Sequence, residues 1–390
     1  MKILNICEIL PLDGLKREND IAIKIQQEIN KIDDSIEFVF LKSIPYSNFL
    51  LAKIKPIWAK YNKYIKLRET IAGGYKTIIF PWFRLPTSKF VIDKNLLIFN
   101  KLLNLKKVEN MLGEEIKTFD LIISQNNIAD GVVANYLSKK YTIPHIHVFR
   151  GQLNEEIYNS KIINDIMTNA NICITPSPTS FNFLKKRNHN ISLFPHGVDE
   201  EYFYDKEKDF SKAKFVTVAR LLKLKNIDMV INSLKSAKEM GYDFEYIIIG
   251  DGPEKLYLEK LVRDLQMEKE IKFTGWLEKD EVIKYLQVAN VFIMPSIPET
   301  LGRVYLEATA AGCLCIGHKG SGIDGFFADR KSAIFSDAAT INDDILEVLK
   351  GLSGDDIQNY TNSAKELVKQ LHWKEVSHKY IELFRKVPNK

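Results

Sequence analysis

The stretch Tyr246-Ile-Ile-Ile-Gly-Asp-Gly-Pro253 places an apolar, β-branched run directly before a glycine-rich turn and a proline. β-branched residues favour strands, glycine permits tight turns, and proline is favoured in the first turn of a helix. The stretch therefore predicts a buried strand that leads through a turn into a helix. It is not the G-x-G-x-x-G fingerprint of dinucleotide-binding proteins, so we do not predict NAD binding from it.

The same order of strand and helix recurs along most of the chain on both sides of this stretch. Such alternation is typical of parallel sheets with helices on both faces. A charged stretch at 200–214 has no strand pattern, and 390 residues exceed one ordinary domain. We therefore predict an α/β chain of two doubly wound domains joined near residue 200. Strands are expected at residues 3–8, 37–41, 77–81, 121–125, 145–149, 172–176, 191–195, 214–219, 245–250, 271–274, 291–295, 314–317 and 333–335.

Composition and the first residues indicate a folded cytoplasmic protein. The content of 45% hydrophobic and 27% charged residues is that of an ordinary globular chain. No apolar run approaches the ~20 residues of a membrane span. Asn5 and Glu8 interrupt the first apolar stretch, which makes it a poor signal peptide. Four cysteines lie in apolar segments without metal-ligand spacing, so we expect buried, reduced thiols at Cys7, Cys173, Cys313 and Cys315.

The segment between Leu41 and Lys107 concentrates positive charge. It contains 14 Lys and Arg against Glu69 and Asp93, a net charge of +12, with aromatic residues between the cations. Such a mixture suits docking on an anionic membrane surface, where each cation contributes about 1 kcal/mol. The same composition also fits a solvated lysine-rich face whose aromatic residues belong to the core, and both interpretations stay open.

The segment from Pro295 to Glu307 combines a strand end, a loop and a helix that begins near Gly302. First-turn amides of a helix lack intrahelical acceptors and carry positive potential, which suits a diphosphate. Glu299 lies before the helix and Glu307 within it, where a carboxylate can accept hydrogen bonds from the two hydroxyls of a ribose. Ordinary structural roles, as a charge at the helix dipole and an exposed helix charge, fit the two positions equally well.

Arg220 and Lys225 form a second candidate pair. The expected strand at 214–219 ends next to Arg220, and Lys225 follows at the start of a helix. In open α/β sheets ligands bind beyond the carboxyl ends of the strands. Two cations at such an end can clamp a pyrophosphate and stabilise a leaving group. Taken alone, the pair fits two ordinary surface-loop cations better.

Together these segments resemble the nucleotide-binding half of retaining GT-B glycosyltransferases of family four, the glycosyl transferases group 1. The resemblance covers residues 194–325 and rests on four motifs in the family's order: the linker Pro195-His-Gly-Val-Asp199, an R-x4-K pair, a G-D-G-P turn and an E-x7-E pair. It implies two Rossmann-like domains facing a central cleft. Their expected limits are 1–198 for acceptor binding and 199–371 for the nucleotide sugar, with a helix at 372–390 that packs back towards the first domain.

The resemblance also implies roles for individual residues. Arg220 and Lys225 hold the diphosphate and, with Glu299 at the transferred sugar, form the catalytic set, while Glu307 binds the ribose. No metal or other cofactor is implied, and no D-x-D metal signature is seen near a strand end. The donor base expected by default is that of uridine diphosphate (UDP), with GDP as the main rival. Further donor contacts are expected at Thr300, Leu301, Gly302, Arg303, Trp276, Leu277, Gly252 and Gly14.

The N-terminal half resembles the family only in strand order and a few short segments. A single glycine, Gly14, stands where many members have a Gly-Gly loop, and Arg150 stands where many have a histidine. Arginine cannot act as a base at neutral pH, but it can stabilise a phosphate or orient an acceptor. The stretch 320–325 departs from the family's Gly-Gly-x-Pro-Glu pattern, so the family's sugar preference does not transfer. The expected acceptor-side residues are Arg150, Gly151, Gln152 and Asn126.

The sequence thus predicts a retaining transferase that moves a hexose-type sugar from a nucleotide sugar to a glycan or lipid-linked acceptor, in the synthesis of cell-surface polysaccharide or glycoconjugate. The expected place is the cytoplasm, peripherally on the inner face of the membrane. A non-catalytic nucleotide-sugar or membrane-binding partner subunit is the alternative, and a sugar-nucleotide epimerase of the same shape is a further one. No nucleic-acid partner is expected, because it would explain the basic segment alone.

Overall fold

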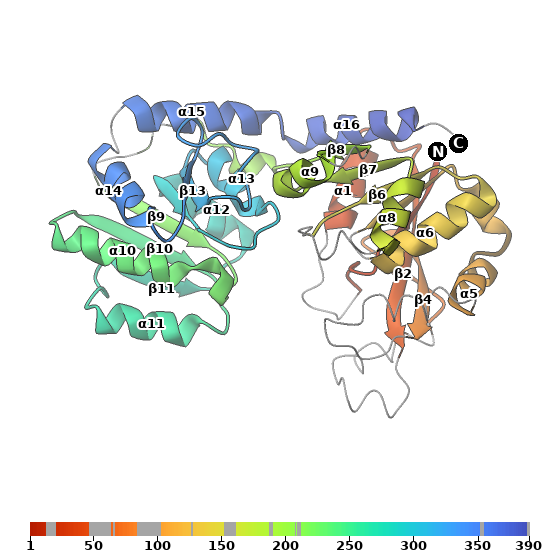
Figure 1. Cartoon of the computed structure of the whole chain (residues 1–390), viewed down its shortest axis with the longest axis horizontal. Coiled ribbons are helices and arrows are strands. Elements are labelled where there is room, and N and C mark those ends of the chain that lie inside the picture. Colours follow the sequence, from red (N-terminus) through yellow and green to blue (C-terminus); the bar gives the residue numbers. More distant parts are fainter. Residues whose placement is uncertain are drawn as a thin grey trace. The chain divides into compact units, whose positions relative to one another are not determined.

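The computed structural model describes residues 1–12, 21–46, 64, 67–83, 103–125, 128–151, 161–186, 190–206, 208, 212–351 and 355–387. The chain divides into two compact units (Figure 1). The N-terminal unit comprises Met1–Thr175, Ser180–Phe194 and Ser377–Lys390, and the C-terminal unit comprises Pro176–Thr179 and Pro195–Val376. This division does not test independent folding, so the expected domain limits stay a prediction.

An eight-stranded sheet forms the N-terminal unit, with the order β3-β4-β2-β1-β5-β6-β7-β8. All neighbouring strands are parallel except β3 and β4, which are antiparallel. The central strands are buried on both faces, as parallel sheets covered by helices require. The strands are β1 (Lys2–Ile6), β2 (Glu37–Tyr46), β3 (Glu69–Ala72), β4 (Tyr75–Phe83), β5 (Leu121–Gln125), β6 (His145–Val148), β7 (Ile172–Thr175) and β8 (Ile191–Leu193).

The helices of this unit follow the strands in the order expected from the alternation. Tyr380 and Phe384 of the last helix pack on Phe194 and Phe38 within the N-terminal unit. The helices are α1 (Ile21–Asn30), α5 (Leu103–Leu112), η3 (Gly113–Thr118), α6 (Ile128–Tyr141), α8 (Lys161–Asn169), α9 (Pro178–Lys185) and α16 (Trp373–Lys386). The first residues of α9 and of α16 are assigned to the C-terminal unit.

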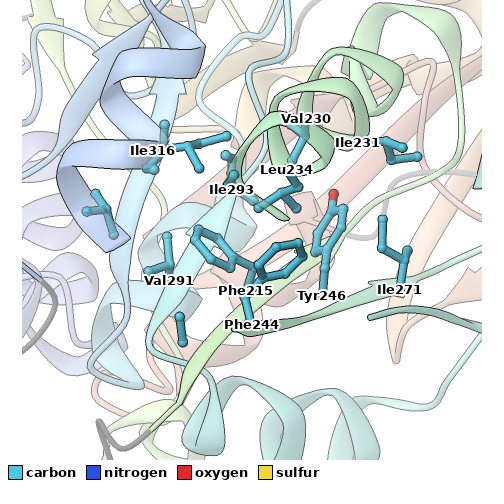
Figure 2. Packing of buried hydrophobic residues seen from close by; sticks show 14 of the residues in the cluster. Phe215, Val230, Ile231, Leu234, Phe244, Tyr246, Ile271, Val291, Ile293 and Ile316 are labelled. Atoms are coloured by element: carbon cyan, nitrogen blue, oxygen red, sulfur yellow. The ribbon is translucent and has the colours of Figure 1, made fainter. Parts of the chain in front are cut away.

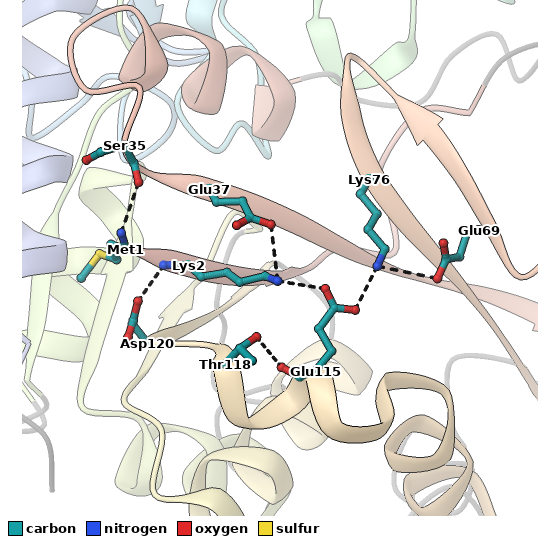
Figure 3. Close-up of polar contacts among 9 residues, drawn as sticks. All are labelled: Met1, Lys2, Ser35, Glu37, Glu69, Lys76, Glu115, Thr118 and Asp120. Atoms are coloured by element: carbon teal, nitrogen blue, oxygen red, sulfur yellow. Dashed lines mark hydrogen bonds and ion pairs between the residues drawn. The ribbon is translucent and has the colours of Figure 1, made fainter.

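A set of ion pairs fastens the amino ends of these strands (Figure 3). Glu115 of η3 binds the ammonium groups of Lys2 on β1 and Lys76 on β4, at 3.0 and 2.9 Å. Burial raises the pKa of the Glu115 carboxyl, but hydrogen bonds from Lys76 and Lys2 outweigh it and hold the pKa below its usual value. These charges therefore support the sheet at the edge opposite to the one where parallel α/β folds bind ligands.

The sequence did not predict β3, and it predicted β2 and β4 too short. β2 was expected to end at Leu41, and the next two residues, Lys42 and Ser43, are polar. The structure buries Lys42 completely, and its ammonium donates hydrogen bonds to the carbonyls of Glu8 and Leu10 at 2.6 and 2.5 Å. A buried charge is tolerated in a strand when such partners compensate its desolvation.

A six-stranded, wholly parallel sheet forms the C-terminal unit, in the order β11-β10-β9-β12-β13-β14. Its strands are β9 (Ala213–Val218), β10 (Phe244–Ile249), β11 (Ile271–Gly275), β12 (Val291–Ile293), β13 (Leu314–His318) and β14 (Ile334–Ser336). Its helical segments are η4 (Glu200–Tyr202), η5 (Lys223–Lys225), α10 (Ile227–Glu239), α11 (Lys255–Asp264), α12 (Lys279–Val288), α13 (Arg303–Ala310), α14 (Ile341–Gly351) and α15 (Asp355–Lys369).

Figure 2 shows the core between this sheet and α10. Phe215 and Phe244, on neighbouring strands, meet edge to face with ring centroids 6.3 Å apart, and Leu234 of α10 packs over them. The Tyr246 hydroxyl, buried in this core, lies 2.7 Å from the Thr217 hydroxyl. The prediction of parallel α/β sheets is confirmed, and the carboxyl ends of β9 to β13 share one edge of the C-terminal sheet.

Candidate functional site

Five loops at the carboxyl edge of the C-terminal sheet contain most of the residues predicted to bind a donor. They follow β9, β10, β11, β12 and β13. Because the strands are parallel, these loops emerge on the same side of the sheet, where ligands bind in open α/β folds. The predicted donor set is thereby placed at one edge of one unit, with the exception of Gly14, which lies outside the described residues.

Lys225 and Glu299 form an ion pair, with Lys225 Nζ 2.5 Å from Glu299 Oε2. Their side chains are only 14% and 16% exposed. The loops that carry them are joined by two further bonds: the Ile297 amide donates to the Leu224 carbonyl (2.9 Å), and Asn226 Nδ2 donates to the Pro295 carbonyl (2.8 Å). The predicted diphosphate cation and the predicted sugar-binding carboxylate are therefore neighbours.

The loop after β13 supports Glu299 from the other side. The Glu299 amide donates to Ser321 Oγ at 2.8 Å, and the Gly322 amide donates to the Glu299 carbonyl at 3.0 Å. In the sequence, residues 320–325 were recognised only as a departure from the family pattern, and no role was predicted for Ser321. These bonds identify Ser321 as a residue that fixes the backbone of Glu299.

Gly302 sets the start of α13, the helix that carries Arg303 and Glu307. Its φ is +69°, and a Cβ atom there would lie 2.6 Å from the Tyr305 ring and 3.3 Å from Glu299 Cγ. Only glycine combines this backbone conformation with so close a contact. Apart from the Tyr305 amide, which donates to the Gly302 carbonyl at 2.9 Å, the first-turn amides after Gly302 lack intrahelical acceptors, so they can bind an anion.

Glu307 lies one and a half turns further along α13, with its side chain 16% exposed. Arg303 Nη2 lies 3.6 Å from Glu307 Oε1. Burial raises the pKa of the Glu307 carboxyl, and the Arg303 guanidinium opposes this shift. Arg303 Nε is buried and has no hydrogen-bond partner among the described residues. The pair can therefore rearrange when a ligand supplies new hydrogen bonds.

Arg220 differs from Lys225 in its surroundings. It follows β9 directly, its side chain is exposed, and no hydrogen bond or ion pair links it to the described residues. Arg220 can therefore bind an anionic ligand without breaking a hydrogen bond or ion pair to these residues.

The turn Gly250–Gly252 brings the loops after β9 and β10 together. The Leu221 amide donates to the Asp251 carbonyl at 3.0 Å, and a Cβ atom at Gly252 would lie 2.3 Å from the Leu221 carbonyl oxygen. This close approach explains the glycine, and a donor contact at Gly252 stays a prediction. After β11, Trp276 is 75% exposed and Leu277 is half-buried, so neither is committed to the core.

Two of the four predicted acceptor-side residues, Arg150 and Gly151, lie in the described part of the chain. Arg150 is buried, and its Nε donates to Gln125 Oε1 at 2.7 Å inside the N-terminal unit. Gly151 is exposed, and its carbonyl accepts a hydrogen bond from Ser180 Oγ at 3.3 Å. Asn126 and Gln152 lie outside the described residues. Their acceptor role stays a prediction.

Two buried histidines of β6 have a structural explanation. His145 Nε2 and His147 Nδ1 both contact the Ser124 hydroxyl, at 2.7 and 2.6 Å. Burial lowers the pKa of His147 to about 3, so this ring is neutral at physiological pH. Both histidines thus serve the packing of β5 on β6.

Within the described ranges, no cluster of three or more His, Cys, Asp and Glu side chains is arranged to hold a metal ion, and no helix has the length and apolarity to cross a bilayer. The absence of a metal requirement stays a prediction. Most of the basic segment between Leu41 and Lys107 lies outside the described residues, so its docking on a membrane surface stays a prediction.

Residues 198–367 match the sequence model of the family Glycosyl transferases group 1. The alpha-monoglucosyldiacylglycerol synthase of Acholeplasma laidlawii is 28% identical over 252 residues, which cover 58% of this chain and 62% of that protein. The enzyme of the same name from Streptococcus pneumoniae is 22% identical over 275 residues, covering 63% and 62%. The chain thus spans about three fifths of these two relatives, 62% of each.

Solved structures match nearly the whole chain. Sucrose-phosphate synthase from Thermosynechococcus elongatus superposes with a TM-score of 0.70 at 16% identity and covers 99% of this chain and 98% of its own. The Anabaena protein HepE, solved in complex with UDP, gives 0.68 at 15% identity over 99% and 100%. At these identities the match establishes the fold alone. Two parallel α/β sheets in this order are the GT-B fold of glycosyltransferases.

Proposed function

We propose that this chain, which belongs to the glycosyl transferases group 1, moves a hexose-type sugar from a nucleotide-sugar donor to a glycan or lipid-linked acceptor with retention. One observation carries the proposal. The ion pair of Lys225 and Glu299, the start of α13 at Gly302 and the half-buried Glu307 all lie in the loops and helix at one edge of one unit. A diphosphate, a sugar and a ribose need these three kinds of partner.

The chemistry follows from the charges at this edge. As the bond from the sugar to the diphosphate breaks, negative charge grows on the leaving phosphate. Lys225, Arg220 and the first-turn amides of α13 stabilise that charge as donors and cations close to the leaving phosphate. In the ligand-free chain Lys225 binds Glu299. When the donor binds, the Lys225 ammonium forms an ion pair with the diphosphate instead. The Glu299 carboxylate then accepts hydrogen bonds from the hydroxyls of the transferred sugar.

Retention follows a same-face route in this proposal. The acceptor hydroxyl attacks from the side that the diphosphate leaves, through an oxocarbenium-like transition state, and the departing phosphate accepts the acceptor's proton. The enzyme then contributes positioning and charge stabilisation. No covalent nucleophile is needed, and none of the steps requires a metal ion.

UDP is the proposed donor diphosphate, and GDP is its rival. HepE, which shares the fold at a TM-score of 0.65 and 15% identity, has been solved with UDP-glucose. That structure supports a UDP-sugar for this chain without fixing the sugar.

A lipid-linked acceptor at a membrane surface is supported by two independent observations. Two relatives are named alpha-monoglucosyldiacylglycerol synthases, enzymes that glycosylate a lipid according to that name. The segment between Leu41 and Lys107 carries a net charge of +12, which favours an anionic leaflet. Peripheral binding on the cytoplasmic face of the membrane would give the enzyme access to a lipid-linked acceptor. The product would be a cell-surface glycoconjugate or polysaccharide.

A transfer assay tests this function. The full chain is incubated with radiolabelled UDP-glucose, UDP-galactose, UDP-N-acetylglucosamine or GDP-mannose, in EDTA, with diacylglycerol in anionic or in neutral vesicles. We expect label in the organic phase with one UDP-sugar, and faster transfer on anionic vesicles. Adding a soluble oligosaccharide as a second acceptor separates a glycan acceptor, which retains the label in water, from a lipid acceptor. No transfer or donor hydrolysis with any sugar would contradict the proposal and favour a non-catalytic partner subunit.

A further inference from the structure

The loop after β13 holds the backbone of Glu299 at both of its polar groups. Glu299 lies between β12 and α13, so no strand or helix fixes its main chain. Its amide donates to Ser321 Oγ at 2.8 Å, and its carbonyl accepts from the Gly322 amide at 3.0 Å. Ser321 is only 1% exposed, so water does not compete for its hydroxyl. Two neighbouring residues therefore fix the main chain that carries the carboxylate assigned to the transferred sugar.

The loop that carries Ser321 is itself closed by hydrogen bonds. The Ser321 amide donates to the His318 carbonyl, and the Asp324 amide donates to the Ser321 carbonyl, both at 3.2 Å. The Asp324 carboxylate accepts the Gly320 amide at 2.6 Å. Because these bonds fix the loop, it does not follow Glu299 when that residue moves. The Ser321 hydroxyl is therefore a fixed acceptor that sets the position of the Glu299 amide.

A serine at this position departs from the family's pattern. Where the pattern reads Gly-Gly-x-Pro-Glu, this chain reads Gly320-Ser-Gly-Ile-Asp324, so Ser321 stands at the second glycine. Glycine has no side-chain oxygen and cannot accept a hydrogen bond from the Glu299 amide in this way. The bond between Ser321 and Glu299 therefore belongs to this chain's own sequence, and the family's pattern does not imply it.

The side chain of Glu299 is also held in place. Its Oε1 accepts the Thr300 amide at 3.1 Å, and its Oε2 binds Lys225 Nζ at 2.5 Å. A Cβ atom added at Gly322 would lie 3.4 Å from Glu299 Cγ, so the loop after β13 lies against the side chain as well as the backbone. In so packed a setting, a shift of the Glu299 main chain also moves its carboxylate.

We infer that Ser321 is a positioning residue for the sugar half of the donor: its hydroxyl holds Glu299 where the carboxylate can accept the hydroxyls of the transferred sugar. The inference rests on the proposed function, which assigns Glu299 to that sugar. The nucleotide half is assigned to other residues, Arg220 and Glu307. Among the described residues, the Ser321 hydroxyl bonds to Glu299 alone. Loss of this hydroxyl should therefore weaken binding of the sugar conjugate and spare binding of the free nucleotide.

Isothermal titration of the full chain tests the inference with pairs of ligands. UDP is compared with UDP-glucose, UDP-galactose and UDP-N-acetylglucosamine, and GDP is compared with GDP-mannose. For the pair that the wild-type chain binds, we take the ratio of the Kd of the sugar conjugate to the Kd of the nucleotide. We expect Ser321→Ala to raise this ratio about fivefold, the effect of losing one neutral hydrogen bond. The Kd of the free nucleotide should not change.

Ser332→Ala is the matched control. Ser332 is 3% exposed and belongs to the same unit, and its Oγ accepts the Ala328 amide at 2.9 Å. The substitution removes the same kind of bond, from a loop amide to a buried serine hydroxyl, away from the residues assigned to the donor. It should lower the melting temperature as Ser321→Ala does and leave the ratio unchanged. A loss of stability alone weakens both ligands together, so the ratio isolates positioning.

An unchanged ratio in Ser321→Ala, or an equal rise in Ser332→Ala, would overturn the inference while wild-type binding upholds the proposed function. Absence of wild-type binding to every sugar conjugate would overturn both. Should Ser321→Ala melt below the working temperature, Ser321→Gly supplies the same test, because it introduces the residue of the family's pattern. A raised ratio in Ser321→Gly supports the inference, and an unchanged one overturns it.

Discussion

Replacing Arg220 with alanine is expected to lower the rate constant of sugar transfer by about 10²- to 10³-fold, the usual effect of removing one group that stabilises transition-state charge. Stability should not change. Arg220 is exposed and has no hydrogen bond or ion pair to the described residues, and substitutions at such positions change stability by less than about 0.5 kcal/mol. Steady-state kinetics and thermal melting of the same preparation measure both quantities.

Arg263→Ala is the matched control for Arg220. Arg263 is an exposed arginine on α11 in the same unit and outside the proposed site, so its loss should leave the transfer rate unchanged. Equal rates for both variants would exclude Arg220 from the reaction. Lys225→Ala is a less clean test, because it leaves the Glu299 carboxylate, 16% exposed, without its cation, and a partly buried unpaired charge destabilises the fold.

Gly250→Ala is expected to destabilise the C-terminal unit by about 3 kcal/mol or more, from steric overlap and backbone strain together. Gly250 has a φ of +133°, and an added Cβ atom would lie 1.9 Å from the carbonyl oxygen of Ala219 and 2.9 Å from its carbonyl carbon. Both are backbone atoms, so β9 or the turn must move. A loss of this size lowers the melting temperature of a domain of this length by about 6–12 °C.

Gly241→Ala separates the two causes. Gly241 also has a positive φ, +87°, but an added Cβ atom there meets no atom within 4 Å. Only the backbone strain applies at Gly241, so we expect the free energy of unfolding to fall by about 1 kcal/mol. Urea unfolding of both variants gives the comparison. If Gly250→Ala lowers the free energy of unfolding by no more than Gly241→Ala does, the close approach of Gly250 to the Ala219 carbonyl is wrong.

The alternation of strands and helices was readable from the sequence because parallel strands covered on both faces are nearly continuous apolar runs. β9 to β14 lie where this pattern placed them, within a few residues. The pattern failed where a charge lies inside a strand. Lys42 ended the expected second strand, whereas the structure extends β2 to Tyr46 because carbonyls of Glu8 and Leu10 satisfy the Lys42 ammonium.

The sequence predicted those residues of the candidate site that belong to short motifs with a fixed spacing. Glu299 and Glu307 belong to one motif around the start of α13, and Arg220 and Lys225 follow one strand. Ser321 was not predicted, because its role depends on a contact between segments distant in the sequence. Its hydroxyl accepts a hydrogen bond from the Glu299 amide, 22 residues away in the sequence.

Thermal stabilisation of the full chain by UDP, GDP and ADP, without divalent cations, tests most directly that this edge is a nucleotide-sugar donor site. A ligand that binds only the folded state at 100 times its Kd adds about 2.7 kcal/mol of stability. We predict that one nucleotide, UDP, raises the melting temperature by several degrees and that Glu307→Ala and Arg220→Ala abolish the rise. No rise with any nucleotide, or an equal rise in both variants, would contradict the account.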